Sequence, residues 1–381
     1  MNDIVFRHYR EGDENQLANL FNLAFQQNGS GFVRTPNNWN WRYVKSPGFE
    51  PEMCQIAEDI DKEKIVGAVI VNLIEMVPIG QNTYLMGDIN DVSTLPDYTN
   101  RGIATKLMEM SIEYMKQKKC DFSILSAGYK GFARKKIYQK LGYFDVDLGI
   151  IFIQFPNIIQ LIKNIYGFAL FFPVLFAFSY IPRLLNRIKL KFYRVFKDFS
   201  YEINHNKKHL EYMNAINKIN PKYYEGYPGY NKRKFSWARI KVPAAQQKPT
   251  YIIIRKNGKI IGGSVITQQN IYSFKFGIKI RIGLIHEIFL EKSMYDNSKN
   301  LIFGYVYLLD KIMKAATRRS LAVLMYLSPL KDKDLNRAFN LMNFLKIKAN
   351  VTMIKELKSN LKFPQIKAPL FVPTYLTFGF P

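Results

Sequence analysis

The amino-acid sequence repeats itself over a long period. A motif of an aromatic residue, a spacer, a tryptophan and a proline six positions later occurs at residues 39–47 and again 196 positions further on, at residues 235–243. Matching hairpin, strand and helix patterns follow both copies in the same order at nearly the same offset. A repeat of this length predicts that one folding unit is used twice. We therefore expect two α/β units in tandem.

The two copies predict the same order of elements. The expected helices span residues 101–118 and 299–317, the buried strands that follow span residues 122–125 and 321–327, and the last helices end at residues 138–143 and 339–344. In each copy a charged turn joins two β-patterned runs ahead of the helix, as in a hairpin. Each unit is thus expected to be a mixed, twisted sheet flanked by helices.

Composition limits the partners and the compartment. The chain has 381 residues, 48% of them hydrophobic, and a formal net charge of +25, which excludes a disordered chain and indicates acidic partners such as phosphorylated cofactors or anionic lipid. No zinc-finger spacing, RNP-type aromatic motif or helix-turn-helix pattern occurs, so we expect no nucleic acid partner. Cys54 and Cys120 are far apart, which argues against a disulfide framework. Without a signal-peptide pattern at the first residues, we expect a cytoplasmic protein.

Residues 92–107 join a strand end, a loop of small residues and a helix start. The first N–H groups of a helix have no intrahelical partner, and together with the helix dipole they bind anions. Gly102 and Ala104 allow the backbone to approach a ligand closely, and Arg101 adds a positive charge. This segment therefore predicts a site for a pyrophosphate.

The same segment resembles the V-x-x-x-P-x-Y-R-x-R-G-I-A stretch of the GNAT acyltransferases, and the resemblance covers most of residues 1–150. It implies that acetyl-CoA is bound as the acyl donor and that no metal is required. The residues that it implies for this binding are Val92, Ser93 and Thr94 at the pantetheine arm and Asn100, Arg101, Gly102, Ile103, Ala104 and Thr105 at the pyrophosphate. Thr99 departs from the Arg or Gln of the family, which removes one side-chain contact and leaves the backbone cradle.

A second motif, at residues 132–143, is similar to the A-x-x-x-Y-x-K-x-G-F/Y helix and turn of the family. It implies that Tyr138 is the general acid that protonates the departing CoA thiolate. Packing of Tyr138 between helix and sheet is the alternative. Gly131 stands where the family often has Asn.

An attacking amine also needs a base, and carboxylates on the strand before the loop are the candidates. Asp88 and Asp91 are three residues apart, so strict alternation would place them on opposite faces of the sheet. We expect Asp91, beside the pantetheine contacts, to face the cleft as the general base. Glu58 on the preceding hairpin is the reserve candidate.

The second copy lacks this chemistry. Residues 291–300 replace the loop without an Arg-Gly-x-Ala helix start, and Phe339 takes the place of Tyr138. We expect a degenerate unit that shapes the acceptor cleft. His286 and Glu287 are expected to be structural, with contact to the acceptor as the alternative.

An apolar and then basic segment joins the two copies. Residues 165–181 are almost wholly apolar, and residues 183–197 carry six Lys and Arg among apolar residues. A membrane span needs about 20 apolar residues, and this run is shorter and contains Pro173. We expect it to pack in an interface or substrate groove, with contact of residues 165–197 with an anionic membrane surface as the alternative. A transmembrane helix in this segment and a homodimer of the chain remain further alternatives.

These patterns predict a catalytic unit at 1–150 that binds acetyl-CoA, a helical bridge at 151–210, a degenerate unit at 211–360 and a tail at 361–381. The expected activity is transfer of an acetyl group from acetyl-CoA to a primary amine by direct attack. The acceptor is a small amine, for which an amino sugar is suggested by analogy. The alternatives are a non-catalytic acyl-CoA-binding scaffold and a membrane-associated acyltransferase that uses longer acyl chains. The protein is expected in the cytoplasm, at most peripheral to a membrane.

Overall fold

A computed structural model describes residues 4–25, 30–193, 196–205, 209–243, 249–273 and 277–371. The chain forms two compact units. Unit 1 contains residues 1–148, 225–243 and 349–381, and unit 2 contains residues 149–224 and 244–348. Neither unit is a continuous stretch of chain.

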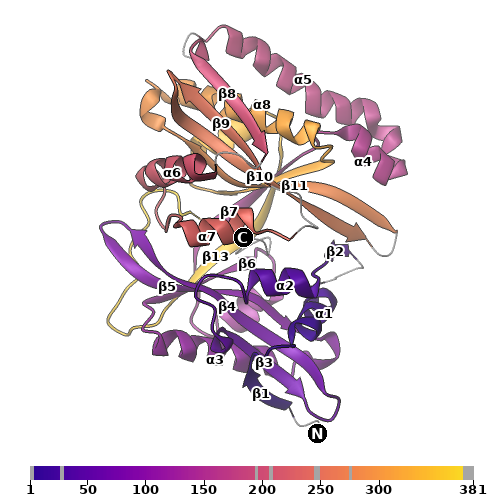
Figure 1. Ribbon diagram of the computed structural model, residues 1–381, viewed down its shortest axis with the longest axis vertical. Helices are drawn as coiled ribbons and strands as arrows, with labels where there is room; N and C mark the ends of the chain where they lie inside the picture. Colours follow the sequence, from indigo (N-terminus) through magenta and orange to yellow (C-terminus); the bar gives the residue numbers. More distant parts are fainter. Residues whose placement is uncertain are drawn as a thin grey trace. The chain divides into compact units, whose positions relative to one another are not determined.

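Unit 1 contains a sheet in the order β1-β3-β4-β5-β6-β13 (Figure 1). Its strands are β1 (Ile4–His8), β3 (Cys54–Asp59), β4 (Lys64–Ile79), β5 (Asn82–Thr94), β6 (Phe122–Gly128) and β13 (Leu345–Glu356); β2 (Ser30–Phe32) lies outside this order. Neighbouring strands are antiparallel except β5 and β6, which are parallel. Every residue from Ile65 to Leu73 is buried, since both faces of the sheet are covered.

Helices cover the two faces of this sheet. They are α1 (Glu14–Phe25), α2 (Pro36–Arg42), α3 (Ile103–Gln117) and α7 (Lys232–Phe235), with the short turns η2 (Pro51–Met53), η3 (Pro96–Tyr98), η4 (Arg134–Tyr138) and η8 (Ser236–Ile240). A Cβ on Gly67 would lie 2.7 Å from Ile103 of α3 and 3.5 Å from Ala57, so this face of β3 and β4 meets α3. The next residue, Glu58, points the other way and reaches Arg7, which also contacts the residue before α1. Helices α3 and α1 therefore lie on opposite faces.

Unit 2 contains a second sheet, in the order β7-β12-β11-β10-β9-β8, with β11 and β12 parallel. Its strands are β7 (Phe144–Gln154), β8 (Phe199–His205), β9 (Thr250–Lys256), β10 (Lys259–Ser273), β11 (Ile278–Leu290) and β12 (Val323–Pro329). Its helices are α4 (Ile158–Asn164), η5 (Tyr166–Phe171), α5 (Phe172–Lys191), α6 (His209–Ile219), η7 (Asn220–Lys222), η10 (Lys292–Met294), α8 (Ser298–Arg318) and α9 (Lys333–Leu341). Twelve of the 21 residues of α8 are buried, which makes α8 the central helix of this core.

The strand that follows the last helix of each copy completes the sheet of the other unit. After η4, the chain enters β7, whose residues 149–154 pair antiparallel with residues 324–329 of β12 in unit 2. After α9, it enters β13, whose residues 350–356 pair antiparallel with residues 122–128 of β6 in unit 1. Each sheet therefore takes one strand from the other half of the sequence.

The two repeated tryptophans meet in unit 1. The indole N–H of Trp41 donates to the carbonyl oxygen of Trp237 at 3.1 Å, and the indole N–H of Trp237 donates to the carbonyl oxygen of Trp41 at 2.7 Å. Both are 4% exposed and pack with Leu73 and Ala238. Equivalent positions of the repeat thus bind each other reciprocally.

The predicted α/β architecture of two tandem units is confirmed, with its long helices at α3 and α8. The units nevertheless do not follow the linear division expected from the sequence, because residues 225–243 and 349–371 belong to unit 1. The expected helical bridge at 151–210 also contains β8, an edge strand of unit 2. Edge strands are half exposed, so their apolar alternation is weak and easily missed in a sequence.

Helix α5, the apolar part of the bridge, is largely exposed within the described chain. Its buried residues are Ser179, Arg183, Asn186 and Leu190, whereas Val174 is 67% exposed. Polar side chains hold the helix in place, and several of its large apolar side chains lie at the surface. By length and composition alone, residues 167–191 form a helix that could cross a membrane, the one such helix in the described chain. Of the expected basic residues, Arg194 lies outside the described residues.

The tryptophan pair predicts the cost of removing one indole N–H. Replacing Trp41 by Phe leaves the carbonyl of Trp237 without its buried donor, so the free energy of unfolding should fall by about 1–3 kcal/mol. Denaturant unfolding measures this loss, with Trp39→Phe, a similar truncation in the same helix, as the control for ring size. Equal losses for the two variants would show that the hydrogen bond contributes nothing.

Candidate functional site

The start of α3 lies in an exposed loop after β5. Gly102 is its N-cap, with φ 77°, and no side chain caps the helix. A side chain at this φ would be strained, which explains the glycine, and the space around its Cα is open. The first N–H groups of α3 therefore remain available, with the positive end of the helix dipole behind them. Backbone groups at this position can hold a phosphate.

The residues predicted for the pyrophosphate, Asn100, Arg101, Gly102, Ile103, Ala104 and Thr105, form one continuous turn into α3. The Arg101 guanidinium lies 4.8 Å from the ring centroid of Tyr98 and donates to the carbonyl oxygen of Asp97 at 3.0 Å. These contacts hold an exposed positive charge beside the helix start. Ile103 is buried and anchors the turn to the core.

The strands β5 and β6 separate next to this turn. They pair only from residues 86–89 to residues 122–125, although β5 continues to Thr94 and β6 to Gly128. Residues 92–94, predicted for the pantetheine arm, lie beyond the last pair, and Ser93 and Thr94 pair with β4 on their other side. No strand pairs with the β6-facing edge of these residues in the part of the chain that is described. This opening can admit an extended ligand.

Tyr138 lies at the end of the π-helical turn η4 and is 8% exposed. Its ring packs edge-on against Tyr143, whose hydroxyl is 2.7 Å from the Ser123 hydroxyl. Ser123 pairs with Gly87, whose Cβ direction points at α3, so Tyr138 lies on the α3 side of the sheet. Burial raises the pKa of Tyr138, which keeps its hydroxyl protonated at neutral pH. The hydroxyl makes no hydrogen bond within the described residues and is available as a donor.

Asp91 lies in a β-bulge, with φ 48°, where the register of β4 and β5 shifts. The bulge breaks the alternation that we assumed, so the prediction that Asp88 and Asp91 face opposite sides is wrong. Asp91 forms an ion pair with the buried Arg34, with 3.1 Å between Nη2 and Oδ1, and accepts a hydrogen bond from the Tyr43 hydroxyl. Uptake of a proton from an amine would have to break this ion pair.

Asp88 is buried at the centre of unit 1 and is 5% exposed. Its carboxylate accepts hydrogen bonds from the Leu73 N–H at 2.8 Å and from the Asn90 side chain at 3.1 Å, and Asn90 in turn accepts from Arg42 at 2.9 Å. Burial and then the charge of Glu75 raise the pKa of Asp88 to about 7. A carboxylate with this pKa can exchange a proton near neutral pH.

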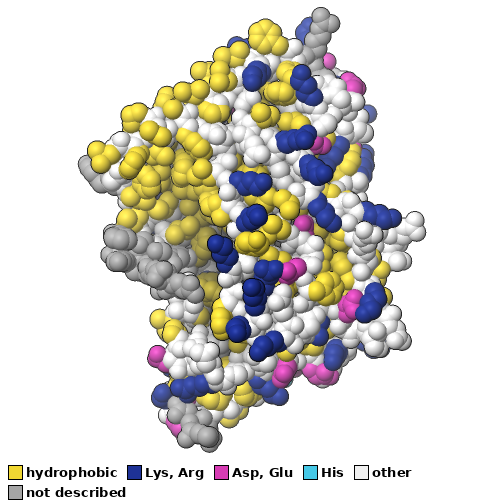
Figure 2. Space-filling model, turned by 180° about the vertical axis from the view of Figure 1, so that it is seen from behind, with side chains coloured by type: hydrophobic (Ala, Val, Ile, Leu, Met, Phe, Trp, Pro, Cys, Tyr) yellow, Lys and Arg dark blue, Asp and Glu magenta, His cyan; other side chains and the backbone are white. Residues whose placement is uncertain are grey.

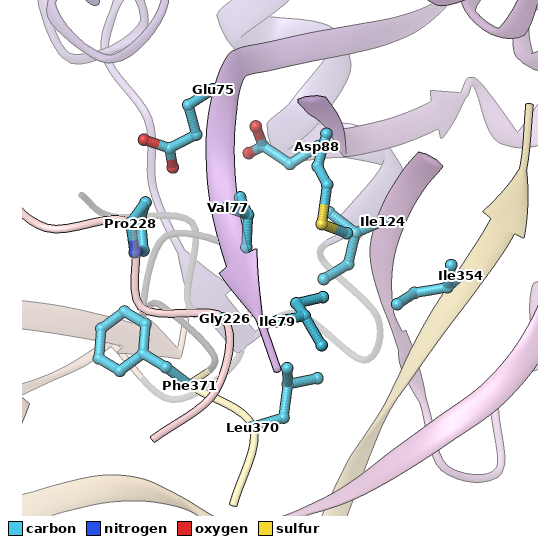
Figure 3. Close-up of a pocket in the computed structure, with 11 residues that line it drawn as sticks. Glu75, Val77, Ile79, Asp88, Ile124, Gly226, Pro228, Ile354, Leu370 and Phe371 are labelled. Carbon is cyan, nitrogen blue, oxygen red and sulfur yellow. The ribbon is translucent and has the colours of Figure 1, made fainter. Parts of the chain in front are cut away.

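A small cavity adjoins Asp88 (Figure 3). It lies on the face opposite α3, because the neighbouring Gly87 points at α3. The carboxylates of Asp88 and Glu75 lie at one end, and the apolar side chains of Ile79, Leu370 and Phe371 lie at the other. Its volume of about 30 Å³ is enough for a water molecule. The ammonium of a lysine on α7 binds Glu75 at 2.5 Å beside it. A water in this cavity would be placed to pass a proton between Asp88 and a bound acceptor amine.

The other predicted polar residues have structural partners. Glu58 binds Arg7 at 2.5 Å. In unit 2, His286 Nε2 lies 2.6 Å from the Thr267 hydroxyl, and Glu287 accepts a hydrogen bond from a tyrosine hydroxyl at 3.4 Å. These contacts agree with the structural role expected for His286 and Glu287.

Unit 2 does not reproduce the features of the first helix start. The N-cap of α8 is Asn297, whose side chain accepts from the Asn300 N–H at 2.9 Å and so occupies one of the free donors. Phe339, in the place of Tyr138, stacks on Phe152 with ring centroids 4.4 Å apart. Unit 2 therefore has a capped helix start and an apolar ring where unit 1 has open donors and a hydroxyl.

The two cysteines are free and buried. Burial raises the pKa of Cys54 and raises that of Cys120 to about 12, so both thiols are protonated and unreactive at neutral pH. No group of three or more His, Cys, Asp or Glu that could hold a metal ion occurs among the described residues. The site geometry thus offers a buried carboxylate and a tyrosine hydroxyl for proton transfer.

Comparison with known sequences matches the first unit to a protein family. Residues 5–144 match the family model of the acetyltransferase (GNAT) domain. The N-alpha-acetyltransferase 30 of Schizosaccharomyces pombe is 29% identical over 93 residues, which are 24% of this chain and 58% of that protein. The chain thus matches less than two thirds of the length of this relative.

Comparison with solved structures extends the likeness to both units. The Saccharomyces cerevisiae N-myristoyltransferase with bound myristoyl-CoA has a TM-score of 0.70 at 11% identity and covers 98% of this chain and 90% of its own. A GCN5-related N-acetyltransferase from Anabaena variabilis has a TM-score of 0.53 at 14% identity and covers 93% of this chain and 73% of its own. The fold of the two tandem units is therefore shared along nearly the whole chain, and residues 5–144 match the acetyltransferase (GNAT) domain.

Proposed function

We propose that this protein transfers an acyl group from acyl-CoA, with acetyl-CoA as the donor, to a primary amine. The observation that carries the proposal is the uncapped start of α3 next to the opening between β5 and β6. In this proposal the pyrophosphate of CoA lies on the backbone N–H groups of residues 100–105, beside Arg101. The pantetheine arm runs along residues 92–94 into the opening.

The chemistry proposed is direct attack of the amine on the thioester. The amine nitrogen forms a bond to the acyl carbon, and the bond from that carbon to the CoA sulfur breaks. The proton lost by the amine goes to Asp88, directly or through a water in the adjoining cavity. The departing thiolate takes the proton of the Tyr138 hydroxyl. The buried, protonated cysteines favour this route over a covalent acyl-cysteine.

The two proton-transfer groups lie on opposite faces of the sheet. Asp88 pairs with Ile124 and lies on the α1 side, whereas Tyr138 lies on the α3 side. The opening between β5 and β6 lies between these faces. Such an arrangement suits an amine that attacks from one face while the thiolate leaves towards the other, with a proton acceptor on the first side and a proton donor on the second. Asp91 remains the alternative base, but its ion pair with Arg34 would have to break before it accepts a proton.

The similar proteins bear on the acyl chain and on the acceptor. The sequence match to an acetyltransferase domain supports acetyl-CoA. The fold shared over 98% of the chain with a myristoyl-CoA complex makes a longer acyl chain the second candidate. Both named enzymes act by N-acylation, and the N-alpha-acetyltransferase supports a peptide α-amine as acceptor alongside the amino sugar expected from sequence. A panel of acyl-CoA donors against peptide and sugar amines, read by release of free CoA, separates these candidates.

The cofactor site predicts the effect of a negative charge at the helix start. Gly102→Glu places a carboxylate where the pyrophosphate binds, so the affinity for acetyl-CoA should fall roughly a hundredfold. Isothermal titration calorimetry measures it. Gly258→Glu is the matched control, since Gly258 has φ 78°, open surroundings and lies in the β9–β10 hairpin of unit 2. Equal affinity of both variants would place CoA elsewhere, and a folded parent that binds no acyl-CoA would leave a non-catalytic protein.

The proposed acid predicts a loss of turnover without a loss of binding. Tyr138→Phe removes the proton donor for the thiolate, so kcat should fall by roughly 10²- to 10⁴-fold while the affinity for acetyl-CoA is unchanged. Steady-state kinetics and calorimetry measure the two quantities. Tyr143→Phe removes the hydroxyl of the neighbouring buried tyrosine and should keep kcat. If Tyr138→Phe also keeps kcat, Tyr138 only packs the helix.

The proposed base predicts the pH profile. Because burial raises the pKa of Asp88 to about 7, kcat/KM should rise with pH and level off above an apparent pKa near that value. Asp88→Asn should remove this rise of kcat/KM with pH, the acidic limb of the profile, and lower kcat/KM by roughly 10²- to 10⁴-fold. Asp91→Asn is the control, and it should lose stability but keep the limb. The opposite result, a limb lost only in Asp91→Asn, would assign the base to Asp91.

A further inference from the structure

Helix α5 buries a mostly polar face and exposes an apolar face. Its buried stripe, Ser179, Arg183, Asn186 and Leu190, recurs every three or four residues. The outer stripe, which lies opposite on the helix, consists of Val174, Ile181, Leu185, Ile188 and Phe192, each exposed between 46% and 81%. In Figure 2 hydrophobic side chains gather along the edge where α5 lies. A surface helix normally shows water its polar face.

Specific polar contacts fix this orientation. Arg183 donates to the Asp310 carboxylate of α8 at 2.8 Å, and the Ser179 hydroxyl donates to the side chain of Gln154 at 2.9 Å. The Asn186 side chain donates to the carbonyl oxygen of Leu341 at 2.8 Å. Turning the outer stripe inwards would break all three contacts and remove both arginine partners, Arg183 and Arg187, from the buried Asp310. The apolar stripe is therefore held outwards by the fold itself.

A basic cleft of about 560 Å³ adjoins the last two turns of α5. Its cationic lining residues are Arg187, Lys191, Lys197, Lys311 and Lys314. Aromatic rings of Tyr193, Phe196 and Tyr307 form much of the rest. The acidic residue in this lining, Asp310, is already bound by Arg183 at 2.8 Å and Arg187 at 2.7 Å. The cleft therefore keeps an excess of positive charge.

The electrostatics of the cleft wall agree with this excess. Lys314 donates to the Tyr201 hydroxyl at 2.7 Å, and this hydrogen bond lowers the pKa of Tyr201. Lys311 lies 4.5 Å from the ring centroid of Tyr307, which holds its ammonium over the cleft wall. A ligand with phosphate groups would find fixed cations here, next to an apolar surface.

We propose that the outer stripe of α5 and the basic cleft beside it dock the protein on the surface of an anionic membrane. The apolar side chains enter the interface between headgroups and acyl chains, and the cations of the cleft bind lipid phosphates. An exposed apolar helix face with cations at its border fits a bilayer surface better than a second protein. A bilayer offers apolar chains and phosphate charge without requiring a surface of complementary shape. The docking concerns unit 2 and is independent of the proposed acyl transfer.

Docking on the surface is favoured over spanning. A spanning α5 would have to carry Arg183 and Asn186 into hydrocarbon, away from Asp310 and Leu341. The cost of an unpaired charge in the bilayer exceeds the benefit of the short apolar stripe. Lying in the membrane plane, α5 keeps all these contacts.

Flotation of the full chain with vesicles tests the docking. The parent should float with vesicles of phosphatidylcholine and phosphatidylglycerol, should bind pure phosphatidylcholine about tenfold more weakly, and should be released by high salt. Ile181→Gln with Leu185→Gln should lower the bound fraction about tenfold, and so should Lys191→Gln with Lys197→Gln.

Matched controls change similar residues elsewhere on unit 2. Leu210→Gln, at a position 55% exposed on α6, and Lys333→Gln with Arg337→Gln, exposed on α9, should float like the parent. All variants should keep the thermal unfolding of the parent, because the substituted side chains are exposed. A test of acetyl-CoA binding on the same variants keeps the outcome separate from that of the proposed function.

Three results would overturn the proposal. The folded parent could fail to bind anionic vesicles at low salt. It could resist extraction by high salt and alkaline carbonate, which would mean that α5 spans the membrane. Sedimentation could show a dimer of the parent that becomes a monomer in the variant Ile181→Gln with Leu185→Gln, in which case a second copy covers α5.

Discussion

Strand exchange is the constraint on which both sheets depend. Strand β6 of unit 1 has β13 as its neighbour, and β12 of unit 2 has β7, so each sheet is completed by a strand from the other copy. Without β13, the edge of β6 would present unpaired backbone groups next to the proposed acyl-CoA opening. The outer edge of β6, beside the proposed opening, is therefore covered by residues that lie more than 200 positions away in the sequence.

Within this shared frame, the two copies have separated their roles through a few residues. An N-cap without a side chain, Gly102, leaves the donors of α3 open, whereas the Asn297 side chain closes those of α8. A tyrosine hydroxyl in one copy is a stacked phenylalanine in the other. The two copies thus differ at a helix cap and at one aromatic ring, the two places where the proposed acyl-CoA site of unit 1 depends on particular residues.

The repeat, the hairpins, the long helices and the helix start at Gly102 could be predicted because each depends on local sequence. Strand exchange could not, since nothing in the sequence of β7 or β13 says which copy it pairs with. The bulge at Asp91 could not be predicted either. One residue with φ 48° inverts the alternation on which the choice between Asp88 and Asp91 was based. The environment of Asp88 escaped as well, since its Asn90 and Arg42 partners form a network only after folding.

The reciprocal pair of Trp41 and Trp237 has a further consequence. The two residues occupy the same place in the repeat, and each gives the other the same hydrogen bond. Contact of a residue with its own equivalent is the mark of an isologous interface, in which two identical chains meet on a twofold axis. The pair, together with the exchanged strands, has the form of a strand-swapped homodimer whose protomers became one polypeptide. Duplication within one chain removes the need for both copies to stay identical, so the residues at the second helix start and at Phe339 are free to differ from those of the first copy.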